Sequence, residues 1–254
     1  MMTTDVPVVR VAVVFGRKGG LSDCGAYAAL HAWKRPGVEL RAVAVRGPGE
    51  KTDANSEVRV DVVDAAEKDR VTQEMKAMDI VTVEADSPEA QGQFEAAFEG
   101  VQAVVSAFGN RQPGMPRFLA STSRKVVQAM KAKGVTRLVQ LSSFGIGDRV
   151  IPSSMIFKLW SFLLVTVLRS AKRDLLAMEN AISTSGLDYV LVRPVGVDPS
   201  RSKIGSWLAV TDPIKEPVEL GIAKSDAGLF LLEEALKPTY HKTALTLCQP
   251  GKRK

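Results

Sequence analysis

Short apolar runs alternate along the chain with longer stretches in which apolar residues recur at helical spacing. Strands with little polar alternation are typical of a parallel sheet whose two faces are both covered by helices. We predict strands at 8–15, 40–45, 80–85, 101–109, 137–143, 188–193 and 244–248. We predict helices at 26–33, 61–78, 88–98, 116–133, 171–184 and 225–236. The pattern therefore predicts an α/β fold, a doubly wound parallel sheet.

Three segments stand apart from this alternation. Residues 47–78 begin with a polar stretch and form an insertion between the second and third predicted strands. From residue 195 the pattern weakens, and residues 195–254 are predicted to be a small irregular region that carries a substrate pocket. Residues 155–168 are apolar, but Lys158 interrupts them and they fall short of the ~20 residues that a membrane span needs. We expect a buried helix or a lid there, and no transmembrane segment.

The first predicted strand ends in a glycine-rich turn, Gly16-Arg17-Lys18-Gly19-Gly20. A buried strand that enters such a turn before a helix is how a Rossmann fold presents backbone N–H groups to a pyrophosphate. The alternative is an ordinary strand-to-helix turn. Residues 21–25 are interpreted as a lengthened loop, with Gly25 as the displaced third glycine. Asp23 would repel a phosphate if it faced inward, and Arg17 and Lys18 would compensate.

The second predicted strand ends in Arg46, at the position where an NAD-binding protein usually carries an acidic residue. A guanidinium suits the 2′-phosphate of NADP because it can donate two parallel hydrogen bonds. By itself, an arginine at a strand end is more often simply solvated. Together with the glycine turn, Arg46 predicts NADP (NADPH) as the cofactor.

Composition limits the other classes. A chain of 254 residues, 45% hydrophobic, suits one well-buried domain, 1–254. The net charge of +6 comes from scattered Lys and Arg without aromatic interleaving, so we expect no nucleic-acid partner. Cys24 and Cys248 are far apart and the two histidines lack ligand neighbours, which favours a reducing compartment and no metal. No signal peptide is recognised, so a cytoplasmic location is expected.

Four blocks together resemble the atypical short-chain dehydrogenase/reductases, the NmrA-like proteins and among them the flavin reductase/biliverdin-IXβ reductase type. The blocks are the glycine turn, the strand that ends in Arg46, residues 126–143 and residues 185–194. Residues 222–228 add a weaker similarity. Apart from 47–78, the resemblance covers most of the chain.

The resemblance implies where the cofactor and substrate lie. It places Asp86 near the adenine, although Asp86 also suits an N-cap, and it places the strand end Ala107-Phe108-Gly109 under the nicotinamide. It implies a hydroxyl near nicotinamide and substrate, from Ser142 or Ser143, with Ser143 closest to the family's serine. The loop that begins Pro194-Val195 is expected to contact the carboxamide.

The Tyr-x-x-x-Lys pair of ordinary short-chain dehydrogenases is missing, because Leu168 stands four residues before Lys172. Lys172 completes the candidate catalytic set with Ser142 and Ser143, although a place at the rim of the cofactor site suits it better. Without a tyrosine, alcohol–ketone chemistry is disfavoured.

The predicted function is an NADPH-dependent oxidoreductase that transfers hydride to a planar conjugated acceptor of the flavin, quinone or tetrapyrrole type. The alternative is a non-catalytic NADP-binding redox sensor or an accessory subunit of a larger assembly. The altered glycine turn and the missing tyrosine favour that alternative, in which residues 47–78 would bind a protein partner.

Overall fold

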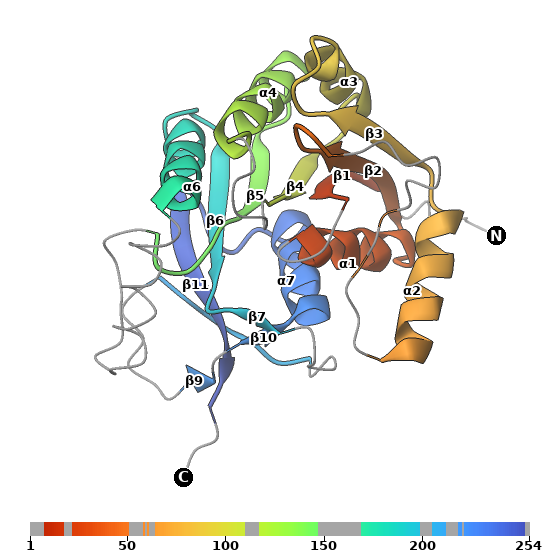
Figure 1. Ribbon diagram of the computed structural model, residues 1–254, viewed down its shortest axis with the longest axis vertical. Helices are drawn as coiled ribbons and strands as arrows, with labels where there is room; N and C mark the ends of the chain where they lie inside the picture. The colour runs from red at the N-terminus through yellow and green to blue at the C-terminus, as the bar shows by residue number, and fades with distance from the viewer. Residues whose placement is uncertain are drawn as a thin grey trace, which may run out of the picture.

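The computed structural model describes the chain at residues 8–17, 22–50, 58, 60, 64–109, 117–146, 169–198, 205–211, 218–219 and 221–251 (Figure 1). The predictions for Lys18, Gly19, Gly20 and the apolar segment 155–168 lie outside these residues.

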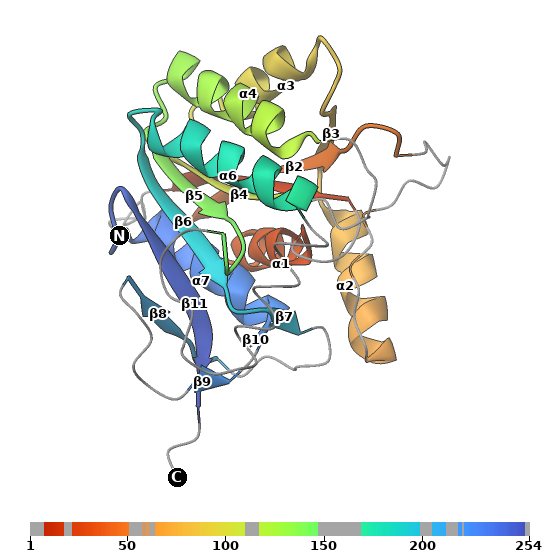
Figure 2. The same cartoon turned by 60° about the vertical axis from the view of Figure 1, so that its left-hand side comes forward.

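A single twisted sheet forms the centre of the molecule, in the order β3-β2-β1-β4-β5-β6-β11-β8 (Figures 1 and 2). In this order, the seven strands β3, β2, β1, β4, β5, β6 and β11 pair in parallel. Strands β8 and β9 each pair antiparallel with β11. A separate parallel pair joins β7 to β10. The bounds are β1 Val9–Gly16, β2 Val38–Arg46, β3 Ile80–Glu84, β4 Ala103–Ala107, β5 Arg137–Leu141, β6 Asp188–Pro194, β7 Val197–Asp198, β8 Leu208–Val210, β9 Val218–Glu219, β10 Ile222–Ala223 and β11 Thr243–Pro250. The predicted doubly wound α/β fold is confirmed.

Helices cover both faces of the sheet, as Figures 1 and 2 show. One face carries α1 and α7, with α2 beside α1, and the other carries α3, α4 and α6. The helices are α1 Ser22–Trp33, α2 Ala65–Ala77, α3 Ala90–Ala97, α4 Leu119–Ala132, α6 Arg169–Ser183 and α7 Lys224–Leu236. None of the described helices is long and apolar enough to cross a membrane.

Strand β1 shows why the strands of this protein do not alternate polar and apolar residues. Val11, Val13 and Phe15 pack into the core under α1 and α7, whereas Ala12 and Val14 pack into the core under α3, α4 and α6. All five side chains are fully buried. Because successive residues of a strand point to opposite faces, a strand covered on both faces must be apolar throughout.

The ends of α4 show two different ways to satisfy backbone groups. At its C-terminus Gly134 has φ +69°, and the Val135 amide donates to the Met130 carbonyl at 2.8 Å, which closes a Schellman motif. At its N-terminus Phe118 has no capping side chain. The buried carboxylate of Asp174, from α6, accepts hydrogen bonds there instead. Its donors are the amides of Phe118 at 3.1 Å, Leu119 at 3.0 Å and Ala120 at 3.1 Å.

Several element boundaries differ from the sequence predictions. Residues 22–25 are the first turn of α1, so the interpretation of residues 21–25 as a lengthened loop is wrong from Ser22 onward. An acidic residue in the first turn, Asp23, favours an early helix start. The predicted strand 244–248 is the longer β11, because its ends pair with β6, β8 and β9. The short strands β7 to β10 carry too few residues for a periodic pattern.

Part of the predicted insertion 47–78 is a helix that packs on α1. The Tyr27 hydroxyl of α1 donates to Glu67 of α2 at 3.0 Å, and Lys34 pairs with Glu74 at 2.5 Å. Asp64 caps α2 by accepting a hydrogen bond from the Glu67 amide at 2.8 Å.

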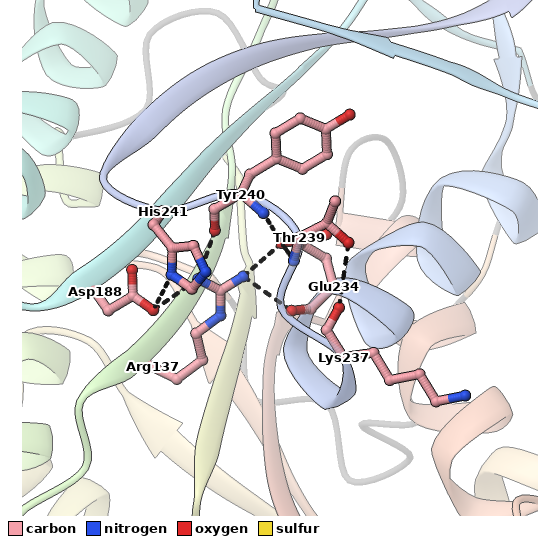
Figure 3. A network of polar contacts seen from close by, with 7 residues as sticks. All are labelled: Arg137, Asp188, Glu234, Lys237, Thr239, Tyr240 and His241. Carbon is pink, nitrogen blue, oxygen red and sulfur yellow. Dashed lines mark hydrogen bonds and ion pairs between the residues drawn. The ribbon is translucent and has the colours of Figure 1, made fainter.

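At the amino edge of the sheet, a buried arginine joins four segments (Figure 3). Arg137, at the start of β5, donates to Asp188 at 3.0 Å, to the Tyr240 carbonyl at 2.9 Å and to Glu234 Oε1 at 2.7 Å. His241 contributes a 2.9 Å hydrogen bond to Asp188. Burial opposes ionisation of Asp188, but the bonds from His241 and Arg137 outweigh it and hold the pKa of Asp188 below its ordinary value. This network fixes the edge opposite the strand ends described below.

The lowered pKa of Asp188 makes part of the stability pH-dependent. We expect Asp188→Asn to lower the free energy of unfolding at pH 7 by about 1–2 kcal/mol, because bonds from charged donors are lost. A carboxyl group whose pKa is lowered by folding stabilises the fold above its unfolded pKa, near 4, and loses that contribution as pH falls through the folded value. The difference between wild type and variant should therefore shrink below pH ~4. Urea titrations between pH 7 and pH 3 measure it.

Asp79→Asn is the matched control for this experiment, because Asp79 is exposed. It should change stability by less than about 0.5 kcal/mol at every pH. A difference between wild type and Asp188→Asn that stays constant with pH would contradict the prediction.

The tertiary cap on α4 predicts a second stability effect. Asp174→Ala removes the acceptor of three buried amides and should cost about 1–3 kcal/mol. Asp174→Asn keeps one acceptor oxygen and should lose less. Denaturant unfolding of both variants measures these costs, and an Asp174→Ala protein as stable as wild type would show that the carboxylate does not act as the cap.

Candidate functional site

The candidate site lies at the carboxyl edge of the sheet, where parallel strands end side by side. Register pairs Phe15 of β1 with Ala107 of β4, and Gly16 with Val45, one residue before Arg46. Because the strands are parallel, the predicted site residues at the ends of β1, β2, β4, β5 and β6 share this edge. Open α/β sheets bind ligands outside this edge, next to the point where the strand order reverses.

Gly25 lets α1 lie close against the sheet. A Cβ added at Gly25 would stand 2.5 Å from the Cβ of Phe15 and 2.9 Å from the Cβ of Ala107, shorter than real side chains allow. The absence of a side chain at Gly25 therefore lets the first turn of α1 pack against the ends of β1 and β4. Close helix–strand packing is the role of the third glycine in a dinucleotide-binding turn.

A second close contact ties α1 to α7. A Cβ at Gly228 would stand 2.6 Å from the Cys24 carbonyl oxygen and 2.7 Å from the Ala28 amide nitrogen. Helix α1 is thus in close contact both with the sheet and with α7 beside it. Burial, with the nearby charge of Asp23, raises the pKa of the Cys24 thiol to about 12, so Cys24 stays a thiol and packs as an apolar side chain.

The acidic residue at the start of α1 is paired. Asp23 and Lys224, the first residue of α7, form an ion pair, and both side chains are buried. An unpaired Asp23 that faced inward would repel a phosphate. Because Lys224 neutralises the carboxylate, the first turn of α1 keeps the positive end of its helix dipole available for an anion.

The two arginines predicted to bind phosphate are both buried. Arg17 follows directly on β1, and Arg46 is the last residue of β2. The guanidinium of Arg46 forms an ion pair with Glu84, the last residue of β3. Glu84 is not among the site residues predicted from the sequence. Nothing in its local sequence signals the contact, which arises from the pairing of two strands.

Phe108, at the predicted nicotinamide side of β4, is part of an aromatic contact. Its ring stacks on Phe118 with centroids 6.3 Å apart, and both side chains are buried. A Cβ at Gly47 would lie 3.1 Å from the Phe118 ring, so this ring also packs against the segment after β2. The side chain of Phe108 is therefore part of the core.

The structure distinguishes the two serines that end β5. The Ser142 hydroxyl is buried and donates to Glu179 Oε1 of α6 at 2.6 Å. Arg193 of β6 holds the same carboxylate with bonds of 2.9 and 2.6 Å. Ser143 is half-buried, and within the described residues its hydroxyl makes one long hydrogen bond, 3.4 Å, to the Phe144 carbonyl. Ser142 is thus engaged in a buried network, whereas Ser143 is partly exposed at the same strand end.

The remaining predicted residues take varied places. Lys172 is half-buried on α6, two turns before Glu179 and so on the same side of the helix. Pro194 and Val195 are tied down by backbone bonds, from the Phe144 amide to Pro194 at 3.3 Å and from the Val195 amide to Leu247 at 2.9 Å.

Asp86 is exposed in the turn between β3 and α3. Its alternative role as an N-cap is wrong, because α3 begins at Ala90 and its N-cap position is Glu89. Lys125 of α4 holds this turn, donating to the carbonyls of Ala85 at 2.9 Å and Ser87 at 3.1 Å. No group of three or more metal-ligating side chains occurs among the described residues.

Comparison with known proteins identifies the class. Residues 83–238 match the sequence model of the NAD(P)H-binding family, and the chain belongs to that family. No curated protein matches the chain.

Solved structures share the fold along nearly the whole chain. A short-chain dehydrogenase/reductase from Veillonella parvula DSM 2008, in complex with NADP, has a TM-score of 0.63 and 13% identity and covers 97% of each chain. A Streptococcus pneumoniae protein described as an NADH-flavin reductase has a TM-score of 0.62 and 16% identity, over 95% of this chain and 99% of that one. An anaerobillin reductase from Escherichia coli O157:H7 has a TM-score of 0.59 and 20% identity, over 97% and 100%. The predicted resemblance to atypical short-chain dehydrogenase/reductases is confirmed.

The described residues fit a dinucleotide. The close approach at Gly25 leaves no room for a side chain between α1 and the strand ends, and the neutralised Asp23 removes the charge that would oppose a pyrophosphate. An arginine stands at the end of β2. The family binds NAD(P)H, and the N-terminus of a helix such as α1 suits the anionic part of such a cofactor.

The contact at Gly25 predicts opposite effects for the same substitution at two helical glycines. Gly25→Ala should lower the free energy of unfolding by about 1–3 kcal/mol, because the new methyl group overpacks the contact with Phe15 and Ala107. Gly92→Ala is the control: nothing lies within 4 Å of a Cβ there, and the substitution should stabilise α3 by about 0.5–1 kcal/mol. Urea denaturation of both variants measures the contrast, and a Gly25→Ala protein as stable as wild type would refute the packing role.

Proposed function

We propose that this protein is an NADPH-dependent reductase that transfers hydride to a planar conjugated acceptor of the flavin, quinone or tetrapyrrole type. The observation that carries the proposal is the placement of the α1 N-terminus by Gly25 beside the ends of β1 and β4, with Arg46 at the end of the adjacent β2. Membership of the NAD(P)H-binding family and two similar structures named as reductases support it.

In this proposal the chain's own residues hold and orient the cofactor. Backbone groups of Gly16, Gly19 and Gly20 and the N-terminus of α1 bind the pyrophosphate, with Arg17 and Lys18 adding positive charge. Arg46 binds the 2′-phosphate, and Asp86 lies near the adenine. When bound, the nicotinamide supplies a hydride. The strand-end backbone at Ala107-Phe108-Gly109 and the loop of Pro194 and Val195 orient it.

The acceptor would meet the protein at the end of β5. Ser143 offers a half-buried hydroxyl there, whereas Ser142 fixes the strand end through Glu179. Lys172 lies on the same side of α6 as Glu179 and serves the rim of the cofactor site. Because the chain lacks a tyrosine four residues before Lys172, the proton that accompanies the hydride comes from solvent.

A non-catalytic NADP-binding redox sensor is the second candidate. The engagement of Ser142 by Glu179 favours it, because this hydroxyl is already committed to the fold. The two candidates share the cofactor site and differ only in turnover.

The first test is a titration of the protein with NADPH and NADH, followed by nucleotide fluorescence. We expect NADPH to bind more tightly than NADH. Arg46→Gln should weaken NADPH binding by about tenfold or more and leave NADH within about threefold, because only NADPH carries the 2′-phosphate. Binding of neither nucleotide would refute the proposal.

The second test separates the reductase from the sensor. NADPH oxidation is followed with a flavin, a quinone and a tetrapyrrole as acceptors. The reductase predicts turnover that Ser143→Ala lowers without a matching loss of stability. NADPH binding without turnover on any acceptor would favour the sensor.

A further inference from the structure

The Arg46–Glu84 ion pair joins the ends of two neighbouring parallel strands. Arg46 and Glu84 are register partners, the last residues of β2 and β3. The Arg46 side chain is 10% exposed, whereas that of Glu84 is 41% exposed. The carboxylate therefore stands on the solvent side of the guanidinium, where a ligand outside the carboxyl edge would approach it.

The strand pairing at this point does not need the side chains. The Ala85 amide donates to the Arg46 carbonyl at 2.9 Å, so a backbone hydrogen bond already fixes the end of β3 against β2. Ion pairs with one exposed partner contribute little to stability. The main consequence of Glu84 is electrostatic: it turns the single positive charge of Arg46 into a neutral pair.

We propose that Glu84 is a specificity-determining residue that limits the preference of this protein for NADPH over NADH. This inference rests on the proposed function, in which Arg46 meets the 2′-phosphate. A phosphate monoester carries a charge of about −1.5 to −2 at pH 7 and needs the guanidinium as a donor. Glu84 competes for the same donors and repels the phosphate, so both effects lower the affinity for NADPH.

The two effects change the affinity for NADH very little. A ribose 2′-hydroxyl is neutral, so a nearby carboxylate neither repels it nor competes with it for an essential cation. A carboxylate is also the group that many dinucleotide sites present to this hydroxyl. The pair Arg46–Glu84 thus combines a guanidinium suited to NADPH with a carboxylate compatible with NADH.

The experiment compares Glu84→Gln with wild type in fluorescence titrations of NADPH and NADH at pH 7.5 and low salt. Loss of one negative charge a few ångströms from the phosphate should tighten NADPH binding by about tenfold and change NADH binding by less than about threefold. The gain should shrink at about 1 M salt, where the Debye length is about 3 Å. Adenosine 2′,5′-diphosphate and ADP, used as competitors, should show the same contrast, because they carry only the adenosine end.

Two further variants make the result specific. Glu99→Gln removes the same charge from a surface ion pair, that of Glu99 with Lys133. Glu99 lies just before the start of β4 and so at the opposite edge of the sheet. This variant should leave the ratio of the two dissociation constants unchanged. Glu84→Asp keeps the charge and should stay near the wild-type ratio. A purely structural role for Glu84 would move the NADPH and NADH constants together.

The failure of each idea has its own signature. If wild type binds neither nucleotide, the proposed function fails. If wild type binds NADPH but Glu84→Gln leaves the NADPH-to-NADH ratio within about twofold, or weakens NADPH binding, the inference about Glu84 is wrong and the proposed function stands. Melting temperatures of all variants confirm that the compared proteins are folded.

Discussion

The close approach of α1 to the sheet at Gly25 is the constraint on which the rest of the site depends. With no side chain at this position, the helix start reaches Phe15 and Ala107, and Gly228 lets α7, which lies on the same face of the sheet, pack closely against the same helix. Any larger residue at either glycine would push α1 outward. The start of α1 would then leave the strand ends, and the dipole that favours an anion there would point elsewhere.

Acidic residues around the site are paired with cations from other elements. Asp23 is held by Lys224, Glu84 by Arg46, and Glu179 by Arg193. The carboxylates of Asp23 and Glu179 are buried and would be costly in a low-dielectric interior without their partners. The pairs also decide what is available to a ligand, because a cation that neutralises a protein carboxylate attracts an external phosphate less strongly. Charge at this edge is therefore set by pairs and not by the overall net charge of +6.

The amino edge and the carboxyl edge of the sheet differ in the contacts that their residues make. At the amino edge, Arg137 joins β5, β6, α7 and the segment before β11 through bonds of 2.7–3.0 Å (Figure 3). At the carboxyl edge, Ser142 is held by Glu179, and the next residue, Ser143, is partly exposed. A rigid amino edge lets the carboxyl edge carry loops and polar groups that would not hold a fold together on their own.

The sequence by itself determined the order of elements, the parallel sheet and the family. Apolar strands such as β1 can be recognised in the sequence because the residues buried on both faces are all apolar. The glycine turn marks the end of β1. Only the tertiary structure decided which of the predicted site residues are engaged in contacts within the fold. It placed residues 22–25 in α1, engaged Ser142 with Glu179, and paired Arg46 with Glu84. Local periodicity carries no information about such contacts, because they join residues 37 or 38 positions apart that meet only when helix and strands pack.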